Sequence, residues 1–355
     1  MPAPVEVPRV DGILSPAECW ATGAAIAGCQ HESGAIPWFP GGPTDPWDHV
    51  QAAMGLTVTG FTDEAERAYD WLRASQRPDG TWGSRYVGDA LHDPTTDANY
   101  CAYVATGVLH HWQATRDNAF LVRMWPTVCD AIDAVLGMQR LDGAIRWACS
   151  PEGTLAAESL VTGNASIHLS FRCAVVLAEA IGCPSAAWEA AAGRLRHALD
   201  EHPEHYTPKD RHAMDWYYPV LGGVLPRAIA RRHIDARWAD FVVDGLGIRC
   251  VRDRPWVTGA ETCELVLALD VVGRREQARE LLAAMQHLRD PDGSYWTGLV
   301  YTDGLRWPVE VSTWTAATVL LAADALSRTT AANGLFRGDG LPVLDFDEEC
   351  SCLAS

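Results

Sequence analysis

Positive charge is scarce in this chain of 355 residues, which has 28 Lys and Arg residues against 46 Asp and Glu residues and a formal net charge of −18 at pH 7. Proteins that bind nucleic acid, anionic membranes or polyphosphate substrates gather positive charge on a face or along a helix. No such stripe is evident in the sequence. We therefore expect no nucleic-acid partner and no membrane partner, and a neutral substrate fits the charge better.

Long apolar runs are missing too. No segment approaches the ~18 consecutive apolar residues of a membrane-spanning helix. Met1 leads into PAPVEVPRVDGIL, without the basic segment and apolar run that an export signal needs, so we expect a cytoplasmic protein. The 11 cysteines are odd in number and lie mostly in apolar helical patterns such as CAYVATGVL, which indicates reduced packing residues rather than a disulfide framework. Cys350 and Cys352 suit a soft metal, but an unstructured tail is the favoured interpretation.

What the chain does contain is a repeat. Four segments share a Gln, a short polar stretch with a Gly, and then a Trp: Gln30–Trp38, Gln76–Trp82, Gln139–Trp147 and Gln286–Trp296. Each follows a stretch with apolar residues at three-and-four spacing, which predicts an amphipathic helix. The Asp-Gly pairs in these segments would stop the helix and turn the chain.

A second series of helices, apolar on almost all sides, follows these turns. The six stretches begin near residues 45, 96, 162, 214, 258 and 309, about 50 residues apart, which is the length of two helices and their connections. Two more amphipathic helices, expected at 185–202 and 233–247, complete six hairpins. The pattern predicts an all-α fold, an (α/α)6 barrel of outer and inner helices. We expect one domain over residues 1–330, a C-terminal tail over 331–355 and few strands.

Polar or acidic groups next to aromatic residues mark the starts of the expected inner helices. In the first of these, PTDPWDHVQ, Asp45 is a good N-cap and would leave Asp48 free for other work. Inner helices of such a barrel run parallel, so their first residues meet at one rim. One Asp there is most often a cap, but six such starts are typical of a carbohydrate site, where rings stack on sugar faces and polar groups hold hydroxyls. The residues predicted to bind substrate are Trp38, Asp45, Trp47, His49, Asp97, Tyr100, His168, Asp215, Trp216, Tyr217, Trp256, Glu264, Glu310 and Trp314.

Hydrolysis of a glycosidic bond needs two carboxyl groups, and neither a metal nor another cofactor. Asp48 lies on the first inner helix and Glu261 on the fifth, two steps apart in a ring of six. This separation favours the wide pair of an inverting enzyme. We predict Glu261, near Trp256 and apolar residues, as the general acid and Asp48 as the general base. If either residue is not catalytic, the alternative is that it caps a helix or forms a salt bridge.

Other interpretations remain open for some of these residues. Asp97, Asp215 and Glu310 suit structural or substrate-holding roles, and a His near a helix is usually a packing residue. A noncatalytic polysaccharide-binding barrel would keep the same aromatic rim. A sugar lyase or isomerase would use Tyr or His as a base, for which Tyr100, Tyr217 and His168 are available. The segment from Trp38 to Gly42 has the composition of a mobile lid.

The Gln-to-Trp turns resemble those of the terpenoid cyclase and protein prenyltransferase toroids, but the chemistry of those families is not matched. The only approximation to a cyclase Asp-x-Asp-Asp motif is Asp345–Glu348, in the expected tail. Glu261-Thr-Cys263 imitates the start of a prenyltransferase zinc site, and no His follows near Trp314 where that site needs one.

A second resemblance is closer. HESGAIPWFPGGPTDPWDHVQAAMGL and TGAETCEL are similar to segments of (α/α)6 glycoside hydrolases, in particular the actinobacterial family that hydrolyses methylmannose polysaccharide. The resemblance implies an inverting, endo-acting hydrolase of α-1,4-linked mannose or 3-O-methylmannose chains. It also implies that Asp48 and Glu261 are the catalytic pair.

Overall fold

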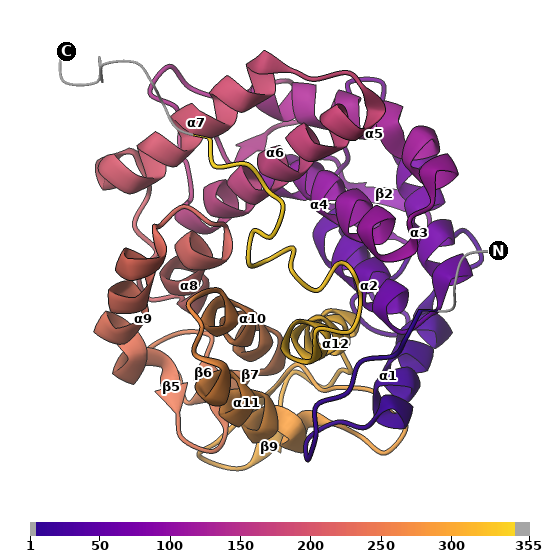
Figure 1. Cartoon of the computed structure of the whole chain (residues 1–355), viewed down its shortest axis with the longest axis vertical. Coiled ribbons are helices and arrows are strands. Elements are labelled where there is room, and N and C mark those ends of the chain that lie inside the picture. The colour runs from indigo at the N-terminus through magenta and orange to yellow at the C-terminus, as the bar shows by residue number, and fades with distance from the viewer. Residues whose placement is uncertain (1–4, 345–355) are drawn as a thin grey trace.

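Two concentric rings of helices make up the protein (Figure 1), which a computed structural model describes over residues 5–344. The outer helices are α1 (Pro16–Cys29), α3 (Thr62–Ser75), α5 (Asn118–Leu136), α7 (Ala186–Glu201), α9 (Arg227–Phe241) and α11 (Arg275–Ala284). The inner helices are α2 (Pro46–Val58), α4 (Ala98–Thr115), α6 (Val161–Ile181), α8 (Ala213–Leu221), α10 (Gly259–Val271) and α12 (Thr313–Ser327). Two 3₁₀ helices cover Pro203–His205 and Met285–Leu288.

The inner ring is closed. Each inner helix packs against the next one in the chain, and α12 packs against α2. The predicted (α/α)6 barrel is thus confirmed. Connections from an inner to an outer helix are short, as from Val58 to Thr62, whereas those from an outer to an inner helix are long, as from Ser75 to Ala98. All the long connections therefore lie at the N-terminal ends of the inner helices.

These long connections contain short strands that the sequence did not predict. β1 (Arg85–Val87) pairs with β2 (Ala90–Asp93), and β3 (Thr96–Asp97) pairs with β4 (Ala148–Cys149). A five-stranded antiparallel sheet follows the order β5 (Val242–Val243), β6 (Gly247–Arg249), β7 (Trp256–Thr258), β8 (Gly298–Val300) and β9 (Leu305–Arg306). Thr258 pairs with Gly298 and is also the last residue before α10. The sheet therefore fixes where α10 begins.

The Gln of the repeat turns joins neighbouring outer helices. The side-chain amide of Gln76, just after α3, donates to the carbonyl oxygen of Gly80 in its own turn at 2.9 Å and to that of Thr127 in α5 at 3.0 Å. This turn is thereby tied to the next helix of the outer ring. Gln30 makes the same two bonds to Gly34 and Glu64, Gln139 makes them to Gly143 and Ala191, and Gln286 instead donates to Leu282 and accepts from the Tyr295 hydroxyl.

One helix boundary differs from the prediction. The outer helix expected at 233–247 begins at Arg227 and ends at Phe241, and the inner helix before it ends at Leu221. Gly223, with φ of +68°, follows the end of α8, and Pro226 precedes α9 with the φ of −54° that suits a helix start. The apolar residues after Phe241 form β5 instead of continuing the helix.

Residues 331–344, predicted as part of a tail, pack on the barrel. They cross the ring at the C-terminal ends of the inner helices (Figure 1), and Ala332, Leu335, Phe336 and Leu341 are buried. Cys350, Cys352 and the segment Asp345–Glu348 lie outside the described residues. Within residues 5–344, no helix is long and apolar enough to cross a membrane.

Candidate active site

The first inner helix is capped by Asp45 and not by Asp48. One carboxylate oxygen of Asp45 accepts the backbone N–H groups of Trp47 at 2.8 Å and Asp48 at 2.9 Å. Its other oxygen accepts the indole N–H of Trp38. Burial raises the pKa of Asp45 to about 6, although these hydrogen bonds lower it. Asp48 is therefore free of the capping role, as the sequence predicted.

Five carboxyl groups gather around the start of α2. Asp48 lies near Asp45, near Glu261 and Glu264 of α10, and near Glu310 just before α12. Burial raises the pKa of Asp48 well above its usual 3.8, and the charges of these four neighbours raise it further. Glu261 and Glu264 are buried, whereas Asp48 remains partly exposed. The structure thus brings the two predicted catalytic residues into one cluster.

Glu264 is held by two tyrosines of α8. Its carboxylate oxygens accept the hydroxyl groups of Tyr217 at 2.5 Å and Tyr218 at 2.7 Å. Burial raises the pKa of Glu264 to about 7, the charge of Glu261 adds to this rise, and the tyrosine hydrogen bonds oppose it. Glu264 is thereby fixed in place beside Asp48. Tyr218 was not predicted, although its position directly after Tyr217 in the sequence DWYYP was a signal.

An aromatic cluster lies beside these acids. The ring of Trp47 lies 6.0 Å from Tyr100, 5.9 Å from Tyr103, 5.9 Å from Tyr218 and 6.4 Å from Trp314, measured between centroids. These residues come from α2, α4, α8 and α12. The buried indole N–H of Trp314 has no acceptor among residues 5–344, and an indole N–H only donates. Tyr103, which follows Tyr100 by three residues on the same helix face, was likewise not predicted from the sequence.

Two of the predicted substrate-binding residues, His49 and Trp216, make contacts with other parts of the fold. His49 accepts the backbone N–H of Ile36 with Nδ1 at 3.0 Å and donates from Nε2 to the carbonyl of Ala68 at 2.9 Å. Burial lowers the pKa of His49 to about 4, which keeps the ring neutral. Trp216 donates to the carbonyl of His233 in α9 and stacks on Phe241 at 5.2 Å. His49 thus ties α2 to α3, and Trp216 faces the outer helix.

Three further predicted residues also make hydrogen bonds or polar contacts within the fold. Asp215 accepts the hydroxyl of Thr162 at 2.5 Å, which links α8 to α6. Glu310 accepts the hydroxyl of Thr297 at 2.9 Å. His168, buried in α6, contacts the carbonyl of Gly222 through Nδ1 at 2.8 Å, while its Nε2 has no partner within the described part of the chain. Nδ1 is therefore the protonated nitrogen, because a carbonyl only accepts.

Of the predicted tryptophans, Trp256 and Trp38 lie outside the inner helices, and both contact neighbouring segments. Trp256 of β7 donates its indole N–H to the carbonyl of Trp307 at 2.9 Å, and the two rings meet edge to face at 5.0 Å. The carbonyl of Trp38 accepts the backbone N–H of Thr313 at 2.8 Å, and the guanidinium of Arg85 lies over its ring at 5.2 Å. Trp38, the first residue of the predicted lid segment, is thus hydrogen-bonded to the start of α12.

A group with metal-ligand spacing lies elsewhere. Ligand atoms of His202, Glu204 and His205, in and beside the 3₁₀ helix after α7, are all within 4.8 Å of one another. None of these residues belongs to the carboxyl cluster around Asp48.

The N-cap of α4 gives a testable pH effect. Asp97 accepts the backbone N–H groups of Asn99 at 2.9 Å and Tyr100 at 3.3 Å, and burial raises its pKa from 3.8 to about 7. Between these values the folded chain keeps a proton that the unfolded chain has lost, so this group makes stability fall as the pH rises through that window.

Asp97→Asn keeps the cap but removes the titration. We expect its free energy of unfolding to fall less between about pH 5 and pH 8 than that of the unchanged chain, measured by urea unfolding at each pH. Equal slopes for the two proteins would contradict this account of Asp97.

The barrel is shared with enzymes that act on sugars. No family model matches the chain. A wild-type glycosidase superposes with a TM-score of 0.68 at 17% identity, covering 92% of this chain and 98% of that chain. D-mannose isomerase superposes with a TM-score of 0.71 at 12% identity, covering 88% and 97%. At these identities the likeness shows the (α/α)6 barrel fold alone, which these glycosidase and isomerase structures share.

Sequence similarity then narrows the class. The MMP endo-(1,4)-3-O-methyl-α-D-mannosidase of Mycolicibacterium hassiacum is 58% identical to this chain over 350 residues, which cover 98% of this chain and 97% of that protein. The chain therefore belongs to the family of that mannosidase and is a glycoside hydrolase, as the sequence predicted.

Proposed function

We propose that this chain is an endo-acting hydrolase of α-1,4-linked 3-O-methylmannose polysaccharide. The observation that carries the proposal is the cluster of Asp48 with Glu261 and Glu264 beside the ring of Trp47. Two carboxyl groups are what glycosidic hydrolysis requires, and ring faces suit a sugar whose methyl groups make it more apolar. The 58% identical relative is an endo-(1,4)-3-O-methyl-α-D-mannosidase, which supports this choice of sugar.

The electrostatics favour Asp48 as the general acid, which reverses the assignment expected from the sequence. Burial and four neighbouring carboxylates raise the pKa of Asp48 and so keep the proton that an acid must donate. In the proposed step, Asp48 protonates the glycosidic oxygen as its bond to the anomeric carbon breaks. Glu261 takes a proton from the water that attacks the opposite face of that carbon, which inverts its configuration.

The aromatic cluster would hold the sugar. We assign stacking to Trp47, Tyr100 and Trp314, and hydrogen bonding to the unpaired indole N–H of Trp314. His49 and Trp216 are left out, since contacts within the fold use them. The nine cysteines of residues 5–344 are free thiols, which suits a reducing compartment, and we place the activity in the cytoplasm.

A sugar isomerase with Tyr217 or His168 as its base is less well supported. The hydroxyl of Tyr217 is bound to Glu264, and burial raises its pKa well above 10. Burial lowers the pKa of His168 to about 3, and Nδ1 of this residue is bound to a carbonyl. Neither group is therefore arranged as a free base near neutral pH.

Product analysis tests the proposal. The purified chain should cut 3-O-methylated α-1,4-mannoside oligosaccharides into shorter internal fragments, each cut adding one water to the total mass, and proton NMR should first detect the inverted β-anomer. Unmethylated mannosides and maltooligosaccharides are the comparison substrates, which show whether the methyl groups and the mannose units are required. Intact methylated oligosaccharides after long incubation would refute the proposed substrate, and α-anomers appearing first would refute inversion.

A further inference from the structure

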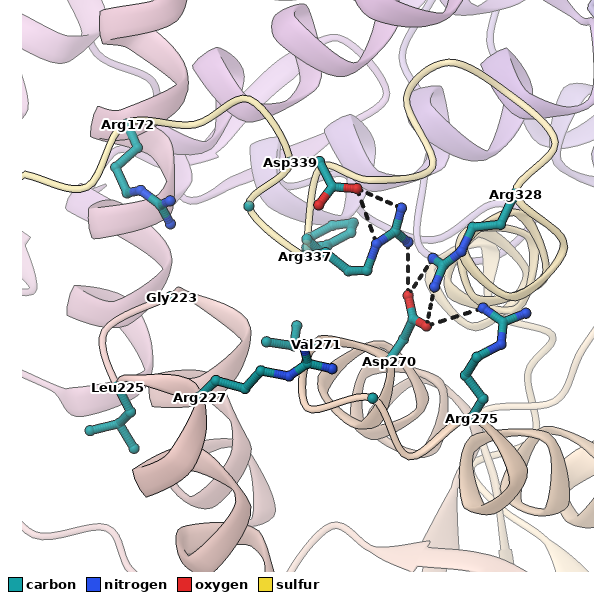
Figure 2. Close-up of a pocket in the computed structure, with 13 residues that line it drawn as sticks. Arg172, Gly223, Leu225, Arg227, Asp270, Val271, Arg275, Arg328, Arg337 and Asp339 are labelled. Carbon is teal, nitrogen blue, oxygen red and sulfur yellow. Dashed lines mark hydrogen bonds and ion pairs between the residues drawn. The ribbon is translucent and has the colours of Figure 1, made fainter.

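A second pocket opens at the other end of the barrel. It has a volume of about 510 Å³ and lies where the C-terminal segment crosses the ends of the inner helices (Figure 2). Its walls come from the C-terminal half of α6, the α8–α9 connection, the end of α10 and residues 336–339. Asp48 and Glu261, by contrast, lie in the first turns of their helices. The two sites are therefore at opposite ends of the inner ring.

The pocket is positively charged in an acidic protein. Five arginines line it, against two aspartates: Arg172, Arg227, Arg275, Arg328 and Arg337, with Asp270 and Asp339. The chain as a whole carries a formal net charge of −18. No positive stripe is evident in the sequence because these arginines are spread along the chain and only the fold gathers them.

Three of the arginines have structural partners. The buried carboxylate of Asp270 accepts two hydrogen bonds from Arg328, at 2.7 and 2.8 Å, and one from Arg337 at 2.8 Å, and Arg275 lies 3.5 Å away. Arg337 also donates to Asp339 at 2.7 Å. This network ties the C-terminal segment to α10 and α12. Both aspartates of the pocket are therefore already paired with arginines.

The other two arginines are not matched in this way. Nε of the buried Arg172 donates to the carbonyl of Pro342 at 2.8 Å, but no acceptor within residues 5–344 bonds to its two terminal nitrogens. The side chain of Arg227, the first residue of α9, makes no hydrogen bond or ion pair with the described residues and interacts with Asp270 only through its charge. Figure 2 shows both side chains reaching into the pocket. The terminal nitrogens of Arg172 and Arg227 are open to the pocket, so they can donate to a molecule bound there.

Glycines make room for these two guanidinium groups. A Cβ at Gly223 would lie 2.3 Å from Nη1 of Arg172, and a Cβ at Gly338 would lie 3.1 Å from its Nη2. A Cβ at Gly273 would lie 2.2 Å from Nη2 of Arg227. The backbone on three sides is therefore shaped around the arginines that lack protein partners.

We propose that this pocket binds a small molecule carrying a phosphate group, with Arg172 and Arg227 as its main donors. A guanidinium presents paired N–H groups that match phosphate oxygens, and the volume is that of a small-molecule site. The three remaining arginines add positive charge around the phosphate. This site is independent of the proposed hydrolase activity, because none of its residues belongs to the cluster around Asp48.

Calorimetric titration of the full chain tests this site. The probes are inorganic phosphate, mannose 1-phosphate and mannose, each at the same ionic strength set with sodium chloride. We expect one phosphate-bearing ligand per chain and no binding of mannose at this site. Tighter binding of mannose 1-phosphate than of phosphate would show that the pocket also holds the sugar, and equal affinity would show that the phosphate group alone is recognised.

Two variants assign the binding to the pocket. Arg227→Gln changes an exposed residue and should weaken phosphate binding by about tenfold or more, as should Arg172→Gln. Arg73→Gln, an exposed change on α3, serves as the matched control and should bind as the unchanged chain does. The proposal would be overturned if neither inorganic phosphate nor mannose 1-phosphate bound. Unchanged affinity in both Arg172→Gln and Arg227→Gln would also overturn it.

Discussion

Replacing Asp48 by Asn, or Glu261 by Gln, should lower turnover by ~10²-fold or more while the chain stays folded. Each amide keeps the shape of the carboxyl group but can neither supply nor accept the proton of the proposed step. Initial rates on methylated mannoside oligosaccharides measure the loss, and thermal melting checks the fold. Glu276→Gln, in the first turn of the outer helix α11, is a matched control and should keep the rate of the unchanged chain. A rate near that of the unchanged chain in either active-site variant would remove that residue from the mechanism.

The leaving group separates the two roles. An aryl mannoside with an acidic phenol needs little protonation as its bond breaks, so Asp48→Asn should lose much less activity on it than on an oligosaccharide. Glu261→Gln should lose similar factors on both, because the attacking water still needs its base. The opposite pattern would restore the assignment expected from the sequence, with Glu261 as the acid.

Gly143→Ala should destabilise the fold strongly. Gly143 lies in the turn after α5 with φ of +87°, and a Cβ there would lie 2.5 Å from the carbonyl oxygen of Arg194 in α7. The left-handed backbone costs alanine about 1 kcal/mol. Crowding against fixed backbone adds roughly 1–3 kcal/mol. The free energy of unfolding, measured with urea, should therefore fall by about 2–4 kcal/mol.

Gly153→Ala is the matched comparison for this change. Gly153 has nearly the same φ, +84°, but a Cβ there would meet no atom within 4 Å. Only the cost of the left-handed backbone remains, so the free energy of unfolding should fall by about 1 kcal/mol. Equal losses in the two variants would show that the close approach between α7 and the turn after α5 contributes little.

The repeat turns show how far local patterns reach. A Gln, a Gly and an apolar helix before them predicted where the outer helices end, and the structure confirms this. The reason the repeat has a Gln became visible only in three dimensions, since the partner of Gln76 is the carbonyl of Thr127 in the next outer helix. The strands were not predicted because each covers only two to four residues, too few for a period of two to stand out.

The carboxyl cluster was predicted in part. Asp45 as the cap, and Asp48 as the free acid beside it, follow from helix-start chemistry, which depends on residues within one turn. The pairing of Glu264 with Tyr217 and Tyr218 depends on α8 and α10 lying side by side. No spacing along the chain encodes that contact.

The sequence by itself determined the ring of twelve helices, because apolar periodicity, caps and turn residues act over a few positions and repeat along the chain. It also marked Asp48 and Glu261 as residues at helix starts. Only the tertiary structure decided which of the clustered acids holds a proton, since the pKa of Asp48 depends on burial and on charges from three inner helices and their approaches. It alone brought Arg172 and Arg227 into one pocket. Electrostatic energies depend on distance and burial, and both are set by the packing of helices far apart in the chain.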